Sequence, residues 1–219
     1  MSALVRPLAA TLDIRLRATA SSLRRHAGRW ELRLAEQELV EIFDAVVITA
    51  PAPQAGALLA NVSSLADALD DVGIAPCWAA MLAFDAPWDV PFEAARFDAG
   101  PIGWIARESS RAGLVGRSDR WLVHAAPQWS TAHLEHAPED ILVRMRAALA
   151  DQTGVALPPI SFAQAHRWRY AMTTRPLGQP FLADASARLW VGGDWCLGAR
   201  VESAFLSGAA MAQAIGASL

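Results

Sequence analysis

The pattern of apolar and polar positions predicts a strand-rich start to the chain. Residues 12–17 and 29–34 alternate apolar and polar side chains, and residues 26–28 between them have the composition of a turn. We expect the two segments to be strands of a small antiparallel sheet. Residues 43–49 form a nearly continuous run of strand-forming side chains, which is typical of a strand buried on both faces in a parallel sheet.

Prolines mark the end of this opening region. Pro51 and Pro53 stop the run of strand formers, and we expect helices over residues 54–60 and 63–70. From Cys77 onward the pattern changes to strands that are separated by Pro, Gly and Asp turns. These strands are expected at residues 77–84, 102–107 and 121–126.

The second half of the chain returns to helices and then to a strand–turn–helix unit. Residues 139–150, which follow Pro138, space their apolar side chains as an amphipathic helix does. Strands are expected at residues 166–171 and 189–191, and a final helix at about residues 201–215.

This order of elements predicts an α/β fold with an α+β insert. The first boundary falls at the prolines of residues 51–53, and the second falls between residues 171 and 180. We therefore assign residues 1–50 and 172–219 to one domain. Residues 51–171 form an inserted domain with a mostly antiparallel sheet.

The strand at residues 189–191 leads into the most informative motif of the chain, Gly192-Gly193-Asp194. Glycines allow a close approach of the backbone, and an aspartate can accept hydrogen bonds from ligand hydroxyl groups. The helix that follows Arg200 begins with Val201 and Glu202, and its free N–H groups and dipole would stabilise negative charge on a ligand. A surface turn before a packing helix is the alternative interpretation.

Composition narrows the possible partners. Hydrophobic residues make up 53% of the 219 residues, so a sizeable core is possible, and the formal charge of −3 gives no reason to expect nucleic acid or a membrane as a partner. All nineteen basic residues are arginine, which excludes a lysine Schiff base and a P-loop lysine. Cys77 and Cys196 have no metal-ligand spacing, and two free thiols favour the reducing cytoplasm.

Nine tryptophans accompany a single tyrosine. Most are expected in the core, but as a group they are compatible with a pocket for a flat aromatic small-molecule substrate. Our candidates for that pocket are Trp104, Trp129, Trp168 and Tyr170.

The histidines and arginines offer further candidates. His124, His133, His136 and His166 have no evident nucleophile as a partner, and we interpret them as surface or strand residues. Four arginines would suit a phosphate-bearing substrate, although surface positions are the alternative: Arg107, Arg167, Arg169 and Arg200.

Short segments in a fixed order give the chain a family resemblance. They are Met1-Ser2-Ala3-Leu4, residues 43–47 with 51–54, residues 75–78, 103–107, 121–125, 128–130 and 166–171, and then the Gly192-Gly193-Asp194 motif with its helix. In this order they resemble the flavin-containing amine oxidase superfamily, and most of all its renalase-like group of bacterial FAD-dependent oxidoreductases.

The resemblance implies a Rossmann-like FAD-binding domain with an inserted substrate domain. It places Asp194 near the ribityl and pyrophosphate part of FAD, and the backbone of residues 200–202 at the N1/O2 edge of the flavin ring. It also implies transfer of a hydride from an amine or a dihydronicotinamide, with oxygen as the electron acceptor. A reduced flavin is anionic near N1, which a helix N-terminus stabilises.

One departure from the family pattern is clear. None of the fourteen glycines forms the GxGxxG fingerprint that opens family members, and Met1 resembles a methionine that lies past that unit. We expect a truncated chain, without its first dinucleotide-binding unit, although a separate N-terminal piece could also supply that unit. The missing unit would leave an exposed sheet edge and the possibility of a homo-oligomer. The alternative is a degenerate, non-catalytic binding or interaction domain that does not hold FAD on its own.

Overall fold

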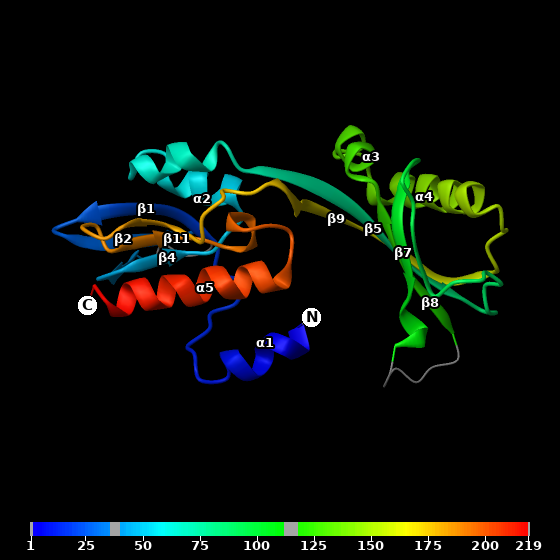
Figure 1. The fold of residues 1–219 in the computed structure, drawn as a ribbon, viewed down its shortest axis with the longest axis horizontal. Coiled ribbons are helices and arrows are strands. Elements are labelled where there is room, and N and C mark those ends of the chain that lie inside the picture. Colours follow the sequence, from blue (N-terminus) through cyan, green and yellow to red (C-terminus); the bar gives the residue numbers. More distant parts are fainter. Residues whose placement is uncertain (1, 36–39, 112–117, 219) are drawn as a thin grey trace. The chain divides into compact units, whose positions relative to one another are not determined.

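A computed structural model describes residues 2–35, 40–111 and 118–218 (Figure 1). Met1, where the family resemblance begins, lies outside these residues. Contacts between residues divide the chain into two compact units, which we call unit 1 (residues 1–72 and 176–219) and unit 2 (residues 73–175). The sequence patterns place the boundaries near residues 51 and 171, whereas the contacts add the helical segment after residue 51 to unit 1.

Unit 1 contains two three-stranded sheets. The first has the order β1-β2-β3 and is antiparallel. The second has the order β10-β11-β4, in which β11 pairs with β10 in the antiparallel sense and with β4 in the parallel sense. The strands of both sheets are β1 (Ala20–His26), β2 (Arg29–Leu34), β3 (Val40–Phe43), β4 (Val46–Ile48), β10 (Leu182–Asp184) and β11 (Leu189–Val191).

The first hairpin corrects one expectation. The turn at Ala27 and Gly28 is confirmed, and both residues have positive φ angles, of 48° and 80°, as a tight two-residue hairpin requires. That turn fixes the pairing of β2 with residues 20–26, so the strand predicted at residues 12–17 is wrong. Without a partner strand, Leu12 and Leu16 remain exposed.

The run at residues 43–49 is also not one buried strand. It divides at Asp44 into the end of β3 and the start of β4, which belong to different sheets. β4 lies at the edge of its sheet, and Val47 is 46% exposed, so burial on both faces is wrong for this strand. The parallel pairing itself is present, with Val46 opposite Leu189.

Helical segments complete unit 1. A helix begins at Ala52 rather than at residue 54, because a proline is tolerated in the first turn. The helix expected over residues 63–70 is a 3-10 helix, which the Ser63 hydroxyl caps by accepting from Leu65 N–H. The segments are α1 (Ser2–Ala9), α2 (Ala52–Leu59), α5 (Val201–Gly216) and the 3-10 helices η1 (Ser64–Leu69) and η3 (Asp194–Cys196).

Unit 2 is built on a five-stranded antiparallel sheet with the order β6-β7-β8-β5-β9, as the sequence predicts for the insert (Figure 1). The segments predicted at residues 77–84 and 166–171 are parts of two long strands that pair along most of their lengths. The strands are β5 (Gly73–Phe84), β6 (Ala94–Arg96), β7 (Ile102–Arg107), β8 (Asp119–Ala125) and β9 (Ile160–Arg175). The helices are α3 (Pro127–Ala132), α4 (Pro138–Thr153) and the 3-10 helix η2 (Glu108–Ser110).

Alternation along these strands gives the sheet of unit 2 two distinct faces. On one face, helix α4 contributes Ile141, Met145 and Leu149 to the main core. The core side chains of the sheet include Trp78, Leu82, Phe84, Ile105, Trp121 and Val123. We call this the α4 face.

No helix within the described residues is long and apolar enough to cross a membrane.

Candidate functional site

The Gly192-Gly193 turn follows β11 and leads into the short helix η3, which precedes α5. Gly192 N–H donates to the Ile48 carbonyl at 3.0 Å, and Gly193 N–H donates to the Ser207 hydroxyl at 3.0 Å. A Cβ atom on Gly192 would lie only 2.6 Å from the Ser207 oxygen. The glycine therefore allows α5 to pack closely against the end of β11, which is a structural reason for its presence beside any approach to a ligand.

Asp194 begins the short helix η3 after this turn. Its carboxylate oxygen Oδ1 accepts from Trp195 N–H at 2.9 Å, and its carbonyl accepts from the N–H groups of Leu197 and Gly198. Its other carboxylate oxygen has no hydrogen bond with a described residue. Trp195 donates from Nε1 to the Ala50 carbonyl, which ties the turn to the segment after β4. Asp194 is thus held in place with one oxygen available.

The start of α5 borders a hollow of about 680 Å³. Arg200 and Glu202 line it, and no side chain caps the helix N-terminus. The N–H groups of Val201 and Glu202 are therefore left for a ligand or for water, whereas Ser203 N–H donates to the Arg200 carbonyl. Val201 beside them is 53% exposed, whereas Ser203 is buried. The complete lining is Leu197, Gly198, Ala199, Arg200, Glu202, Ser203 and Leu206.

The two cysteines are not candidates for nucleophilic chemistry. Burial raises the pKa of the Cys77 thiol to about 11, against a weaker opposing effect of its hydrogen bond to the Ala125 carbonyl. Burial also raises the pKa of Cys196. Both groups stay protonated at neutral pH, and a protonated thiol is a poor nucleophile.

The second candidate region is the face of the unit 2 sheet opposite helix α4. One row of paired residues crosses all five strands there, in the order Arg96, Trp104, His124, Ala79 and His166. Residues directly opposite each other in antiparallel strands project to the same face, so these five side chains share it.

Aromatic contacts support this arrangement. The rings of Trp104 and His124 lie 5.1 Å apart, and those of His166 and Trp168 lie 4.5 Å apart. Burial lowers the pKa of His124, with a weaker opposing effect of Glu108, so its imidazole is neutral at pH 7. We call this surface the aromatic face and define it by Trp104, His124, His166 and Trp168.

The four aromatic residues predicted for the pocket do not all lie together. Trp104 and Trp168 share the aromatic face, and Tyr170 follows Trp168 along β9 where the pairing with β5 is irregular. Trp129 lies on α3, stacks on His133 at 4.1 Å and packs against the core of the α4 face. The structure therefore brings two of the four together and separates Trp129 from them.

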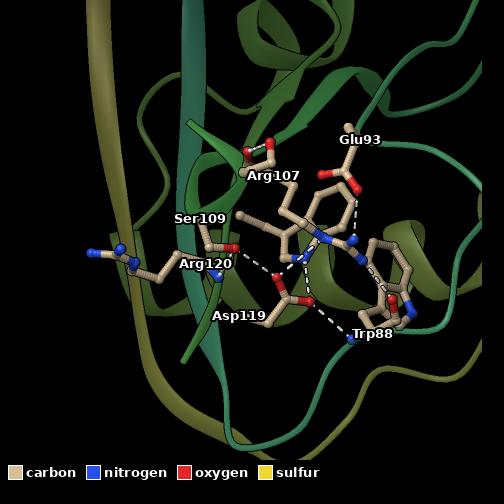
Figure 2. A network of polar contacts seen from close by, with 8 residues as sticks. Trp88, Glu93, Arg107, Ser109, Asp119 and Arg120 are labelled. Atoms are coloured by element: carbon tan, nitrogen blue, oxygen red, sulfur yellow. Dashed lines mark hydrogen bonds and ion pairs between the residues drawn. The ribbon is translucent and has the colours of Figure 1, made fainter. Parts of the chain in front are cut away.

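Figure 2 shows why Arg107 is not an anion-binding residue. Its guanidinium pairs with Glu93 (Nη1–Oε1, 2.9 Å) and with Asp119 (Nε–Oδ1, 3.2 Å), and it donates to the Trp88 carbonyl. Burial raises the pKa of Asp119, but the hydrogen bonds that it accepts and the Arg107 charge together outweigh burial and lower it. This network braces the segment between β5 and β6 against the sheet.

The other arginines of unit 2 differ in whether they form an ion pair with an acid. Arg167 and Arg169 both pair with Glu135, at 2.9 and 2.7 Å, so these two cations share one carboxylate. Arg96 and Arg120 are not paired with any acid in the described parts of the chain, although neither stands in a recognisable motif. Only the register of the strands, which the sequence does not give, places both on the aromatic face.

Comparisons with known proteins agree with this fold. The sequence model of the family described as flavin containing amine oxidoreductase matches residues 1–216. A crystal structure from Exiguobacterium sp. 255-15, whose assignment as a protoporphyrinogen oxidase is provisional, matches with a TM-score of 0.71 and 18% identity, over 98% of this chain and 50% of that one. A redesigned putrescine oxidase matches with a TM-score of 0.57 and 10% identity, over 74% of this chain and 36% of that one. The chain thus spans about half the length of the first of these structures.

Proposed function

Because this chain belongs to the family of flavin-containing amine oxidoreductases, we propose that it acts as part of an FAD-dependent oxidoreductase of the renalase-like kind. Unit 1 would hold the cofactor and unit 2 would contact the substrate. The observation that carries the proposal is the uncapped start of α5 beside a hollow, next to a fixed aspartate with one free oxygen.

The residues at this end of unit 1 fit a flavin nucleotide. The backbone N–H groups of Val201 and Glu202 suit the part of the flavin ring that becomes negative on reduction. The available oxygen of Asp194 suits a ribityl hydroxyl group. Gly192 and Gly193 keep the turn narrow, and Arg200 at the helix start adds positive charge beside the hollow.

FAD, when bound, would supply the redox chemistry, which is oxidation of an amine or a dihydronicotinamide by hydride transfer, with oxygen as the final electron acceptor. The residues of this chain bind and orient. Trp104 and Trp168 offer flat apolar surfaces to a ring, and Tyr170 and Trp129 remain proposed contacts of the substrate. The fourteen glycines of this sequence do not form the GxGxxG motif, which binds the dinucleotide in the family pattern.

An absorbance spectrum tests the proposal directly. The purified chain, after incubation with FAD and removal of free cofactor, should retain a flavin spectrum. Asp194→Ala should reduce FAD retention, whereas Asp151→Ala, an exposed position on α4, should leave it unchanged. A colourless protein after FAD addition would favour the alternative, a degenerate binding domain that holds no flavin on its own.

The unpaired edge of β4 supports a second proposal, which concerns association of the chain with another copy. β4 pairs on one side with β11 and has no partner on its other side among the described strands. We propose that two copies of the chain associate through this edge, because an unpaired strand is a template for another one. Light scattering should show a dimer that Val47→Lys converts to a monomer, and a wild-type monomer would contradict this.

A further inference from the structure

The charges on the aromatic face indicate which class of ligand it accepts. Among the residues that the register places there, Arg96 and Arg120 carry full positive charges and no residue is acidic. Glu108, which follows β7 and whose charge acts on His124, pairs with Arg111 at 3.0 Å. The face is therefore aromatic in its middle and positive toward β6 and the start of β8.

We propose that this face binds a flat aromatic ligand that carries an anionic group, and that Arg96 and Arg120 recognise that group. The inference rests on the proposed function, because it takes this face as the substrate side of a flavin enzyme. It also deepens that function, because it selects an anionic substrate over the cationic amines that the family name suggests.

The aromatic part of the ligand would lie over the row from Trp104 to His166. Ala79 stands between His124 and His166, and its small side chain, only 3% exposed, leaves the larger rings to rise on either side. Trp168, 55% exposed, extends the apolar surface along β9. Stacking on such rings is favourable for any flat ligand, whatever its charge.

Arg96 is placed to reach an anionic substituent of that ligand. It lies opposite Trp104 in the same row, and neighbouring strands are about 4.8 Å apart, so Arg96 is about 10 Å across the sheet from His124. Its side chain is exposed and makes no ion pair with a described residue. A ring stacked near Trp104 and His124 would therefore bring a carboxylate or phosphate within reach of this guanidinium.

Arg120 provides the independent observation. Figure 2 shows its side chain pointing away from the network around Asp119, toward the opposite side of the sheet from Arg107. Its Nε and Nη2 atoms are buried and have no hydrogen-bond partner among the described residues. A buried donor without a partner costs free energy, and an anionic ligand group would remove that cost. Arg107, which faces α4, also has a buried Nε without a hydrogen-bond partner, but its charge is paired with Glu93 and Asp119.

A cationic amine meets two opposing effects on this face. The rings attract a cation through their π electrons, whereas two unpaired arginines repel it. The repulsion has a longer range, and neither guanidinium forms an ion pair with a described residue, while Glu108, whose charge acts on His124, is paired with Arg111. We therefore expect discrimination by charge to dominate over discrimination by ring shape.

Three probes with one ring system test this charge preference on the full chain. They are 2-naphthoate, 2-naphthylmethanol and protonated 2-naphthylmethylamine, each titrated by calorimetry at pH 7.5. The naphthoate should bind roughly tenfold more tightly than the ammonium probe, with the alcohol between them. Equal binding, a preference for the ammonium probe or no binding of any probe would overturn the inference.

Single substitutions test which residues cause the preference for the anionic probe. Arg96→Gln and Arg120→Gln should each weaken naphthoate binding by roughly three- to tenfold and leave the alcohol unchanged. Trp104→Ala should weaken the binding of all three probes, including the uncharged alcohol, which separates stacking from charge. Arg146→Gln, on the exposed side of α4, is the matched control and should change nothing. Unchanged naphthoate binding in both face variants, with circular dichroism showing intact folds, would contradict the assignment.

The result separates this inference from the proposed function. A chain that prefers naphthoate but retains no FAD supports the charge preference and counts against the flavin proposal. A chain that retains FAD but shows no charge preference supports the flavin proposal and overturns the inference.

Discussion

The sheets of the two units differ in how completely they are buried. The sheet of unit 2 has five strands and packs one face against α4 around fully buried side chains such as Trp121, Ile105 and Ile141. Unit 1 has its own buried residues, among them Trp190, but its sheets have three strands each and leave Val47 half exposed. Sheets of three short strands depend more on what covers them.

Large exposed apolar side chains are more numerous in unit 1, where Leu16 is 83% exposed and Phe205 on α5 is 66% exposed. Unit 2 exposes fewer of them, among them Trp168. Apolar surface of this kind commonly marks a site where a ligand or another segment binds. The comparison favours a unit 2 that carries its own stability, and we propose that unit 1 gains stability from a cofactor or a partner.

The largest expected effect is in the core of unit 2. Trp121→Ala should lower the free energy of unfolding by about 3–5 kcal/mol, because it empties the space between Trp88 and Phe92 and removes a hydrogen bond to Asp119. Urea denaturation followed by circular dichroism measures this. Val143→Ala, at an exposed position on α4, is the control and should change stability by less than about 0.5 kcal/mol. A small effect of Trp121→Ala would remove the contrast between the units.

The next effect concerns the packing of α5 in unit 1. Gly192→Ala should cost about 1–3 kcal/mol, since its Cβ would lie 2.6 Å from the Ser207 oxygen and 2.9 Å from Met211 Cε. Gly208→Ala meets no atom within 4 Å and should instead stabilise the helix by about 0.5–1 kcal/mol. Thermal unfolding of the two variants compares them, and equal shifts would show that α5 does not pack closely at Gly192.

A smaller, pH-dependent effect is expected at Asp119. Its pKa is lower in the folded chain than the ordinary 3.8, so its ionised form stabilises the fold above that pH, and this contribution is lost as pH falls through the lowered pKa. Asp119→Asn should cost about 1–2 kcal/mol at pH 7 and less at pH 3. Urea denaturation at both values tests the sign, and a cost that grows toward low pH would contradict it.

The smallest expected effect on stability concerns the exposed ring of Phe205 on α5 in unit 1. Phe205→Ser should change the stability of the isolated chain by less than about 0.5 kcal/mol, because the ring is exposed. If FAD or a second copy covers α5, the same variant should lower the affinity for that ligand or copy. Calorimetric FAD titration and sedimentation of the wild type and variant measure both, and a large stability loss in the monomer would show that the ring is buried there.

Local patterns predicted several elements well. The strands at residues 102–107 and 189–191 and the starts of α4 and α5 are confirmed, since alternation, a proline and a run of small residues are signals that a single element carries. The strand at residues 12–17 was wrong because alternation alone does not supply a partner. Local patterns did not distinguish Trp104 from Trp129 as pocket residues. They do not show that Trp104 lies on the aromatic face of a sheet, whereas Trp129 lies on a short helix that packs against the core.

The sequence by itself determined the family, through the order of its short motifs, and the positions of the Gly192-Gly193-Asp194 turn and the helix after it. These are local features, in which neighbouring residues fix the backbone. Only the tertiary structure decided which arginines are neutralised and which share a face with Trp104 and His124. Strand order and register decide this, and they depend on contacts between residues far apart in the chain, which local patterns do not encode.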